Sequence, residues 1–354
     1  MWTMMGISEG LGPPVAMVLL EVIYSGMFIL SKMALVDGLS IRVFVVYRQA
    51  VATLVLAPAA YFSSSCSLTW KSFWWIFLSA FVGATMNQNL ALEGLYLASA
   101  SVTCATSNLI PAITFVLSYF VGLEKLDFRS PRSYGKIIGT VVCITGAMVM
   151  DFLRGSKLLN AATASPILVG PVGERDWIVG CVCMIAYVFC WPIWLILQVP
   201  IIKCHPNHIS ASAWTCAFSV LQSAVVALVI DRDSRAWILK PNIELAACIY
   251  TGVFATGVAF FVQSWSISIK GPAYSAMFNP LSTVIVTIIE SLFLQEALYI
   301  GSLAGGVAVI VGLYIVLWGK AGDSTREEAP NVQSVGKPES QDDLEDRLLA
   351  SSTR

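Results

Sequence analysis

One long apolar pattern occurs twice in this chain, and the duplication restricts the possible folds more than any other feature. Gly83 and Pro111 lie 28 residues apart, and so do Gly252 and Pro280. A set of glycines follows each block at a constant offset of 166 residues: Gly135, Gly139 and Gly146, then Gly301, Gly305 and Gly312. Each copy also carries a proline inside an apolar segment. The chain is therefore predicted to consist of two copies of one membrane unit, a plan typical of transporters.

The composition requires a lipid environment. Of the 354 residues, 57% are hydrophobic and only 12% are charged, whereas a soluble domain carries about 25% charged residues. The mean hydropathy is +0.75. The net charge is −1, and because the chain has no basic run we expect no nucleic-acid partner. Membrane lipid is the expected surrounding.

Ten segments read as membrane-spanning helices, since about 20 mostly apolar residues cross a bilayer. They are residues 15–36, 41–62, 73–97, 101–121, 134–153, 177–198, 209–230, 245–268, 272–293 and 299–318. The predicted fold class is an all-α integral membrane protein of ten transmembrane helices. Its parts are a cytosolic N-terminus (1–14), a first repeat (15–153), a linker loop (154–176), a second repeat (177–318) and a disordered cytosolic tail (319–354).

The parity of the spans predicts the relative orientation of the repeats. Five spans per repeat is an odd number, so the second repeat enters the membrane from the opposite side, as an inverted repeat with a binding site near the midplane. The even total places both termini on one side. With cytosolic termini, the inner loops hold nine lysines and arginines against six outside, which favours that orientation.

Four ionisable residues within the predicted spans stand out: Glu21, Arg48, Glu93 and Glu290. Each costs about 2.5–3.5 kcal/mol at the centre of a span, so each is a candidate functional residue. The structural alternative is that the side chain reaches an interface or pairs with a neighbour. For Glu21 and Arg48 both interpretations stay open.

Polar residues recur at helical spacing on several spans. Glu21, Tyr24 and Ser25 share one face of the first span. A single stripe can be hydrogen-bonding between helices, but stripes on most of the non-terminal spans favour one shared polar cavity. The candidate substrate-binding residues are Glu21, Tyr24, Ser25, Lys32, Arg48, Asn89, Glu93, Ser107, Asn108, Tyr187, Trp191, Trp194, Gln263, Asn279 and Thr283.

Pro111 and Pro280 are predicted helix breaks, about a third of the way into their spans. Proline removes one helical hydrogen bond and clashes with the carbonyl of residue i−4, here Ser107 and Ala276. Freed backbone at that depth needs a partner or a water-filled cavity. The last span of each repeat carries small residues at four-residue spacing, which favour close packing within the bundle or in a homodimer.

Motifs for other chemistry are missing from the sequence. It contains no phosphate-binding glycine loop, nucleophile elbow or HExxH motif, and the carboxylates have no nucleophile beside them. The two histidines, His205 and His208, are too few for a structural zinc site. The nine cysteines are expected to pack as small apolar residues. We expect no enzyme activity, no metal and no cofactor.

The chain resembles the plant nodulin-like EamA transporters of the drug/metabolite superfamily, the UMAMIT and walls-are-thin-related family. Matching segments begin at Val46 (VYRQA), Glu93 (EGLYLASA), Asn108 (NLIPAITF), Met277 (MFNPLSTV) and Gly312 (GLYIVLWGK). The resemblance implies two inverted five-helix repeats, cytosolic termini and a substrate site among spans one to four and six to nine. Glu21 departs from the pattern, because relatives commonly carry Gln there, and Glu290 is also unusual.

The predicted function is that of an amino-acid transporter, a bidirectional facilitator or exporter that works by alternating access. Glu21 or Glu93 would face the substrate ammonium, and Arg48, Lys32 or freed amides near the breaks would face its carboxylate. The alternatives are auxin or another organic anion as substrate and, from other classes, an intramembrane enzyme or a non-transporting scaffold. The resemblance implies the plasma membrane, with the vacuolar membrane second.

Overall fold

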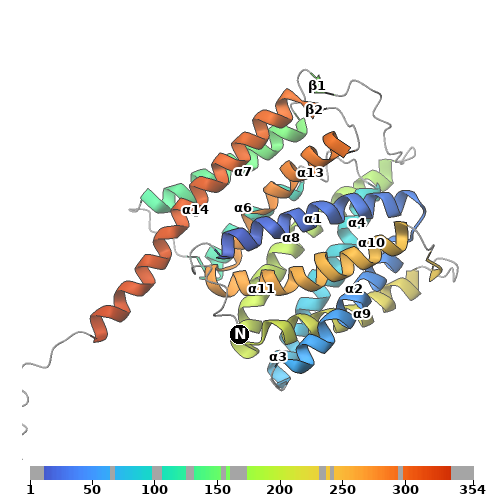
Figure 1. Cartoon of the computed structure of the whole chain (residues 1–354), viewed down its shortest axis with the longest axis horizontal. Helices are drawn as coiled ribbons and strands as arrows, with labels where there is room; N and C mark the ends of the chain where they lie inside the picture. The colour runs from blue at the N-terminus through green and yellow to red at the C-terminus, as the bar shows by residue number, and fades with distance from the viewer. Residues whose placement is uncertain are drawn as a thin grey trace, which may run out of the picture.

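A computed structural model describes residues 12–63, 68–97, 106–124, 131–152, 157–159, 174–230, 237–239, 243–293 and 298–335. These residues are nearly all helical, which confirms the predicted fold class (Figure 1). Residues 1–11, most of the predicted linker and the end of the predicted tail lie outside the described residues.

Helices lie at all ten predicted positions. The first half contains α1 (Gly12–Val36), α2 (Ile41–Phe62), α3 (Trp70–Ser79), the π-helix η1 (Ala80–Met86), α4 (Asn87–Leu97), α6 (Ile110–Phe120) and α7 (Pro131–Phe152). The second half contains α8 (Glu174–Cys204), α9 (His208–Ile230), α10 (Ile243–Gly252), the π-helix η3 (Val253–Val258), α11 (Ala259–Lys270), α12 (Pro272–Ala276), α13 (Asn279–Phe293) and α14 (Ile300–Val335).

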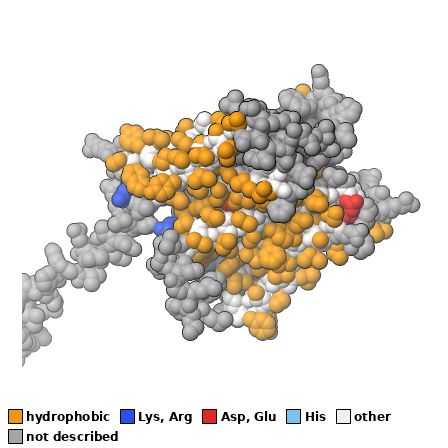
Figure 2. Space-filling view, turned by 45° about the horizontal axis from the view of Figure 1, so that its top comes forward, with side chains coloured by type: hydrophobic (Ala, Val, Ile, Leu, Met, Phe, Trp, Pro, Cys, Tyr) orange, Lys and Arg blue, Asp and Glu red, His pale blue; other side chains and the backbone are white. Residues whose placement is uncertain are grey.

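The surface of the bundle suits a bilayer. Figure 2 shows a face that is mostly hydrophobic, with the visible charged side chains mainly at its two ends. Seven helical segments of the described residues are long and apolar enough to cross a membrane. The predicted spans 73–97, 101–121 and 134–153 are not among them, and α6 has only 11 residues. The total of ten spans therefore stays a prediction.

The final helix of each half packs against the other, and glycines allow the close contact. A Cβ atom added to Gly139 would lie 2.8 Å from the Gly312 carbonyl oxygen, and one added to Gly312 would lie 2.8 Å from the Gly139 carbonyl oxygen. Likewise, a Cβ atom added to Gly146 would lie 2.9 Å from the Gly305 carbonyl oxygen. The small residues predicted to pack closely thus join α7 to α14 within one chain (Figure 1).

The third span of each half contains a π-helical turn, η1 or η3. Gly83 lies within η1, and Gly252 is the last residue before η3. The two glycines that revealed the duplication therefore mark a shared local distortion. Such π-turns are rare and occur often at functional sites.

The fourth span of each half is broken before its proline. Asn108 and Leu109 form a turn before α6, and Met277 and Phe278 form a turn between α12 and α13. Pro111 and Pro280 are the second residues of α6 and α13. Proline is tolerated there because the first turn of a helix needs no backbone N–H donor. The structure therefore has a helix break just before each proline.

Two features were not predicted. A short strand in the linker, β1 (Lys157–Leu159), pairs antiparallel with β2 (Leu298–Tyr299) just before α14. The helix α14 also continues through residues 319–335, the first part of the predicted tail. Good helix formers such as Arg326, Glu327 and Ala329 favour that continuation.

Candidate functional site

The polar stripe of α1 faces the interior of the bundle. The Glu21 side chain is only 1% exposed and Ser25 is fully buried. The Ser25 hydroxyl donates to the Glu21 carbonyl oxygen at 2.7 Å and to the Ser282 carbonyl oxygen at 3.3 Å. Ser282 is also within hydrogen-bonding reach of the Glu21 carboxylate. The first turn of α13, which follows the helix break, therefore lies against Glu21.

Arg48 of α2 is buried in the same region of the bundle. Its Nε donates to Thr256 Oγ1 of η3 at 2.9 Å, so the π-turn of the second half holds the guanidinium of the first. The next residue, Gln49, is fully buried, and both of its amide atoms have no hydrogen-bond partner among the described residues. Gln49 and Thr256 were not selected from the sequence, although Thr256 belongs to the repeated block.

Four aromatic side chains from α1, α8 and α11 form an aromatic wall (Tyr24, Trp191, Trp194 and Phe260). The Trp191 ring meets the Tyr24 ring edge-on, with 6.3 Å between the ring centroids. It also lies tilted against the Trp194 ring, with 5.0 Å between the centroids. Trp194 also packs on Phe260 at 5.0 Å. Gly83 of η1 makes room for Trp194, since a Cβ there would lie 1.9 Å from Trp194 Cδ1. The periodicity of α8 indicated Trp191 and Trp194 but not Phe260.

The aromatic wall and the charged residues meet at Tyr24. The Tyr24 hydroxyl interacts electrostatically with Glu21, Arg48 and Tyr187, which come from α1, α2 and α8. Neither Glu21 nor Arg48 takes part in an ion pair between described residues. We call the set Glu21, Tyr24, Arg48, Tyr187, Trp191 and Trp194 the central site.

Several buried polar atoms of this region have no hydrogen-bond partner among the described residues. They include Glu21 Oε1, the Tyr24 hydroxyl and the indole nitrogens of Trp191 and Trp194. Buried polar groups are almost always hydrogen-bonded, to protein or to ordered water. In a bundle surrounded by lipid, these atoms suit a polar solute or water held between the two halves.

Gln263 of α11 is a predicted site residue that is engaged within the second half. Its Nε2 donates to Ser275 Oγ of α12 at 2.9 Å, while its Oε1 has no partner among the described residues. Asn89 of α4 donates to the Thr85 carbonyl oxygen at 2.7 Å, within its own span. No described contact joins either residue to the central site.

Glu93 lies apart from the central site. It pairs with Arg42, at the start of α2, with 3.1 Å between Oε2 and Nη2, and the two side chains are 33% and 22% exposed. The structural alternative for this carboxylate, pairing with a neighbour, is therefore what the structure shows. Ser107, Asn108, Asn279 and Thr283 lie at the helix breaks. The side chains of Lys32 and Glu290 lie outside the described residues.

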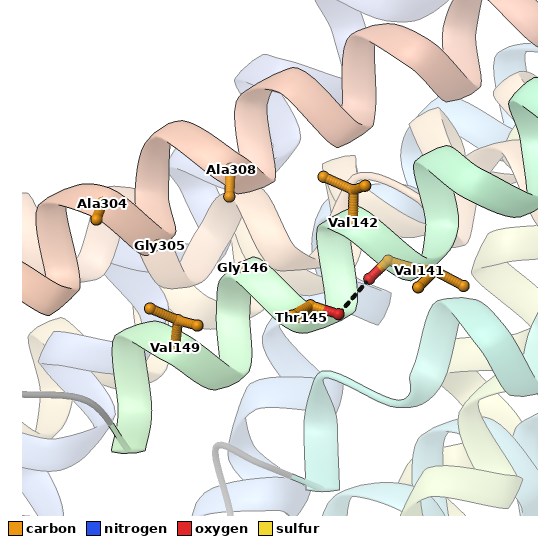
Figure 3. A pocket seen from close by; sticks show the side chains of 8 residues that line it. All are labelled: Val141, Val142, Thr145, Gly146, Val149, Ala304, Gly305 and Ala308. Carbon is orange, nitrogen blue, oxygen red and sulfur yellow. Dashed lines mark hydrogen bonds between the residues drawn. The ribbon is translucent and has the colours of Figure 1, made fainter.

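A groove between α7 and α14 has a volume of about 340 Å³. Figure 3 shows Val142, Val149, Ala304 and Ala308 around it. The one side-chain hydroxyl that lines it, that of Thr145, donates to the Val141 carbonyl oxygen of its own helix at 2.8 Å. The groove offers no recognition for a polar solute, so the central site is the candidate functional site.

The fold and this site define a class of protein: a helical membrane protein of two halves that enclose buried polar and charged residues. The EamA-like transporter family matches residues 13–151 and 178–318, one copy in each half. The chain belongs to that family and is a membrane transporter of the plant EamA type.

Curated plant proteins are similar over most of the chain. The WAT1-related protein At4g30420 of Arabidopsis thaliana is 48% identical over 87% of this chain and 85% of its own length. The WAT1-related protein At4g28040 of the same plant is 44% identical over 93% of this chain and 91% of its own length. Protein WALLS ARE THIN 1, from the same plant, is 34% identical over 89% of this chain and 85% of its own length.

A solved structure shares the fold at low sequence identity. It is titled "Crystal structure of protein", and its TM-score to this chain is 0.66 with 13% identity, over 86% of this chain and 96% of its own. At that identity the likeness concerns the fold alone.

Proposed function

We propose that the protein carries amino acids across a membrane by alternating access, as a bidirectional facilitator or exporter. The observation that supports this substrate class is a buried acid and a buried base, Glu21 and Arg48, that both interact electrostatically with Tyr24 and do not form an ion pair with each other. An amino acid carries one ammonium and one carboxylate group, so it complements both residues at once.

Each charged residue has a role in this proposal. Glu21 binds the substrate ammonium, and Arg48 binds the carboxylate while Thr256 holds its Nε. A buried unpaired charge is costly, and an ion pair with the ligand recovers part of that cost. The side chain of the substrate packs on the aromatic wall, whose rings are apolar on their faces and carry polar groups at their edges.

Proteoliposomes with purified protein test this function. We would measure the flux of L-glutamine, L-glutamate, L-lysine and indole-3-acetate, and then compare two substitutions. Arg48→Gln should weaken apparent affinity about 10- to 100-fold, because a charged hydrogen bond contributes about 1.5–3 kcal/mol. Arg42→Gln is the matched control, since it removes a part-exposed arginine outside the central site. Equal effects of the two substitutions, or no flux of any amino acid, would refute the proposal.

Auxin or another organic anion is the second candidate, and the aromatic wall favours it. Trp191, Trp194 and Phe260 present rings that suit a flat aromatic solute, and Arg48 suits its carboxylate. Glu21 opposes an anion, so Glu21→Gln should then raise the flux of indole-3-acetate. A loss of indole-3-acetate flux in Glu21→Gln would exclude this candidate.

We further propose the plasma membrane as the location, with the vacuolar membrane as the alternative. Microscopy of a fluorescent fusion in plant cells decides between them. A homodimer through α7 and α14 was also predicted from their glycines. Because Gly139, Gly146, Gly305 and Gly312 are used between the two halves of one chain, a dimer would have to use other residues. The mass of the purified protein in detergent tests for it.

A further inference from the structure

The Glu21 carboxyl group is buried inside the bundle. Its side chain is 1% exposed, and its Oε1 has no hydrogen-bond partner among the described residues. None of the ion pairs between described residues includes it. The nearest polar contact from another helix is Ser282, in the first turn of α13, where the backbone N–H groups favour negative charge weakly.

The helices packed on α1 carry titratable and charged groups, and among the described residues none forms an ion pair with Glu21. Tyr24 lies three residues further along the same helix, and it interacts electrostatically with Arg48 on α2 and Tyr187 on α8. On α10, the Tyr250 hydroxyl donates to the Ile23 carbonyl oxygen at 3.2 Å. Other such residues on the neighbouring helices α10, α11 and α12 are Glu244, Cys248, Lys270 and Tyr274.

Two other carboxylates of the described bundle, one buried and one part-exposed, are paired with cations. Glu124, just after α6, accepts from Lys136 at 3.1 Å and from Lys320 at 2.8 Å. Glu93 pairs with Arg42. An ionised carboxylate inside a membrane protein costs several kcal/mol unless a positive charge accompanies it. Glu21 therefore needs a cation from outside the protein whenever it is ionised in the closed bundle.

We propose that Glu21 carries a proton whenever the substrate ammonium is absent, so that each substrate molecule is exchanged for one proton. The inference deepens the proposed function and rests on it for the substrate.

The proposed exchange releases one proton and takes up one proton for each substrate molecule carried. The neutral acid Glu21–COOH gives its proton to water on the side from which the substrate enters, and the carboxylate pairs with the substrate –NH₃⁺. On the other side the ammonium leaves and a proton from water restores the acid. No other bond changes, and one positive charge moves opposite to each zwitterion.

The proton on Glu21 can be measured without any substrate. Infrared spectra of the reconstituted protein at neutral pH should show the C=O stretch of a buried carboxylic acid. This band should disappear in Glu21→Gln and persist in Glu93→Gln, the control with a carboxylate paired to Arg42. Glu21→Asp keeps the carboxyl group and should retain a shifted band, which guards against loss through misfolding. A spectrum that Glu21→Gln leaves unchanged would overturn the proposal.

The exchange itself is tested in proteoliposomes with L-glutamine, at a membrane potential held at zero by potassium and valinomycin. An interior more acidic by one pH unit should drive about tenfold accumulation, since one pH unit is a tenfold ratio of proton activity. Glu21→Gln should abolish this accumulation, while Glu93→Gln should behave like the unchanged protein.

Three further outcomes are distinguishable. Flux without accumulation in the unchanged protein would support the proposed function and refute the exchange. Accumulation that Glu21→Gln retains would place the proton on another group and refute the assignment. An infrared band without flux of any solute tested would leave Glu21 a protonated residue but refute both the proposed function and the exchange.

Discussion

Gly83 should tolerate no side chain, because the aromatic wall fills the space beside it. A Cβ at Gly83 would lie 1.9 Å from Cδ1 and 2.2 Å from Cγ of Trp194. Trp194 is 1% exposed and packs against two other rings at 5.0 Å, so the indole cannot move aside freely. Forcing extra volume into a packed interior costs about 1–3 kcal/mol. Gly83→Ala should therefore destabilise the protein by that amount.

Gly94, later in the same span, is the matched control. A Cβ there would lie 2.5 Å from the Met184 sulfur, and methionine is flexible enough to shift. In detergent, the midpoint of thermal unfolding should be about 2–6 °C lower for Gly83→Ala than for the unchanged protein. In a larger domain each kcal/mol lowers the midpoint by roughly 2 °C. Gly94→Ala should change the midpoint by much less.

A double substitution makes the reasoning refutable. Trp194→Ala removes the clashing ring and costs about 3–5 kcal/mol by itself. Adding Gly83→Ala to Trp194→Ala should then cost little, with a coupling free energy of about 1 kcal/mol or more. Additive losses would show that the two residues do not compete for space, and equal effects of Gly83→Ala and Gly94→Ala would refute the packing argument.

Three further predictions concern stability, each measured by thermal unfolding in detergent. Glu124→Gln should cost about 3–5 kcal/mol because it removes the carboxylate charge that pairs with two buried lysines, whereas Glu93→Gln should cost about 0–1 kcal/mol for a part-exposed pair; equal losses would contradict this. Gly139→Leu should unfold the protein or separate α7 from α14, and a normal melting curve would show that the glycine contact is dispensable. Burial lowers the pKa of His205, in the turn after α8, below its usual 6.5. The unfolded chain then binds the proton more readily, so stability should be complete above about pH 6.5 and fall below it; His205→Asn should weaken that fall, and an unchanged pH profile would exclude His205 as its source.

The duplication and the helix breaks could be read from the sequence because both depend on local chemistry. Proline favours a kink or a helix end because it lacks the backbone N–H donor, and regularly spaced glycines favour close contact whatever the partner. The sequence could not show that Gly139 meets Gly312, because the spacing of small residues on one helix carries no information about the helix that packs on it. For the same reason the sequence could not distinguish a contact within one chain from a contact between the two chains of a dimer.

The sequence by itself determined that this chain lies in a membrane, that it has two related halves, and that charged residues sit within its spans. Periodicity and hydropathy report each helix alone, and they ranked Glu21 and Glu93 alike. Only the tertiary structure separated them: Arg42 pairs with Glu93 at a part-exposed position, while Glu21 is buried beside Ser282 of α13 and takes part in no ion pair between described residues. The cost of a buried carboxylate depends on which charges other helices bring to it, and that is a property of the packed bundle.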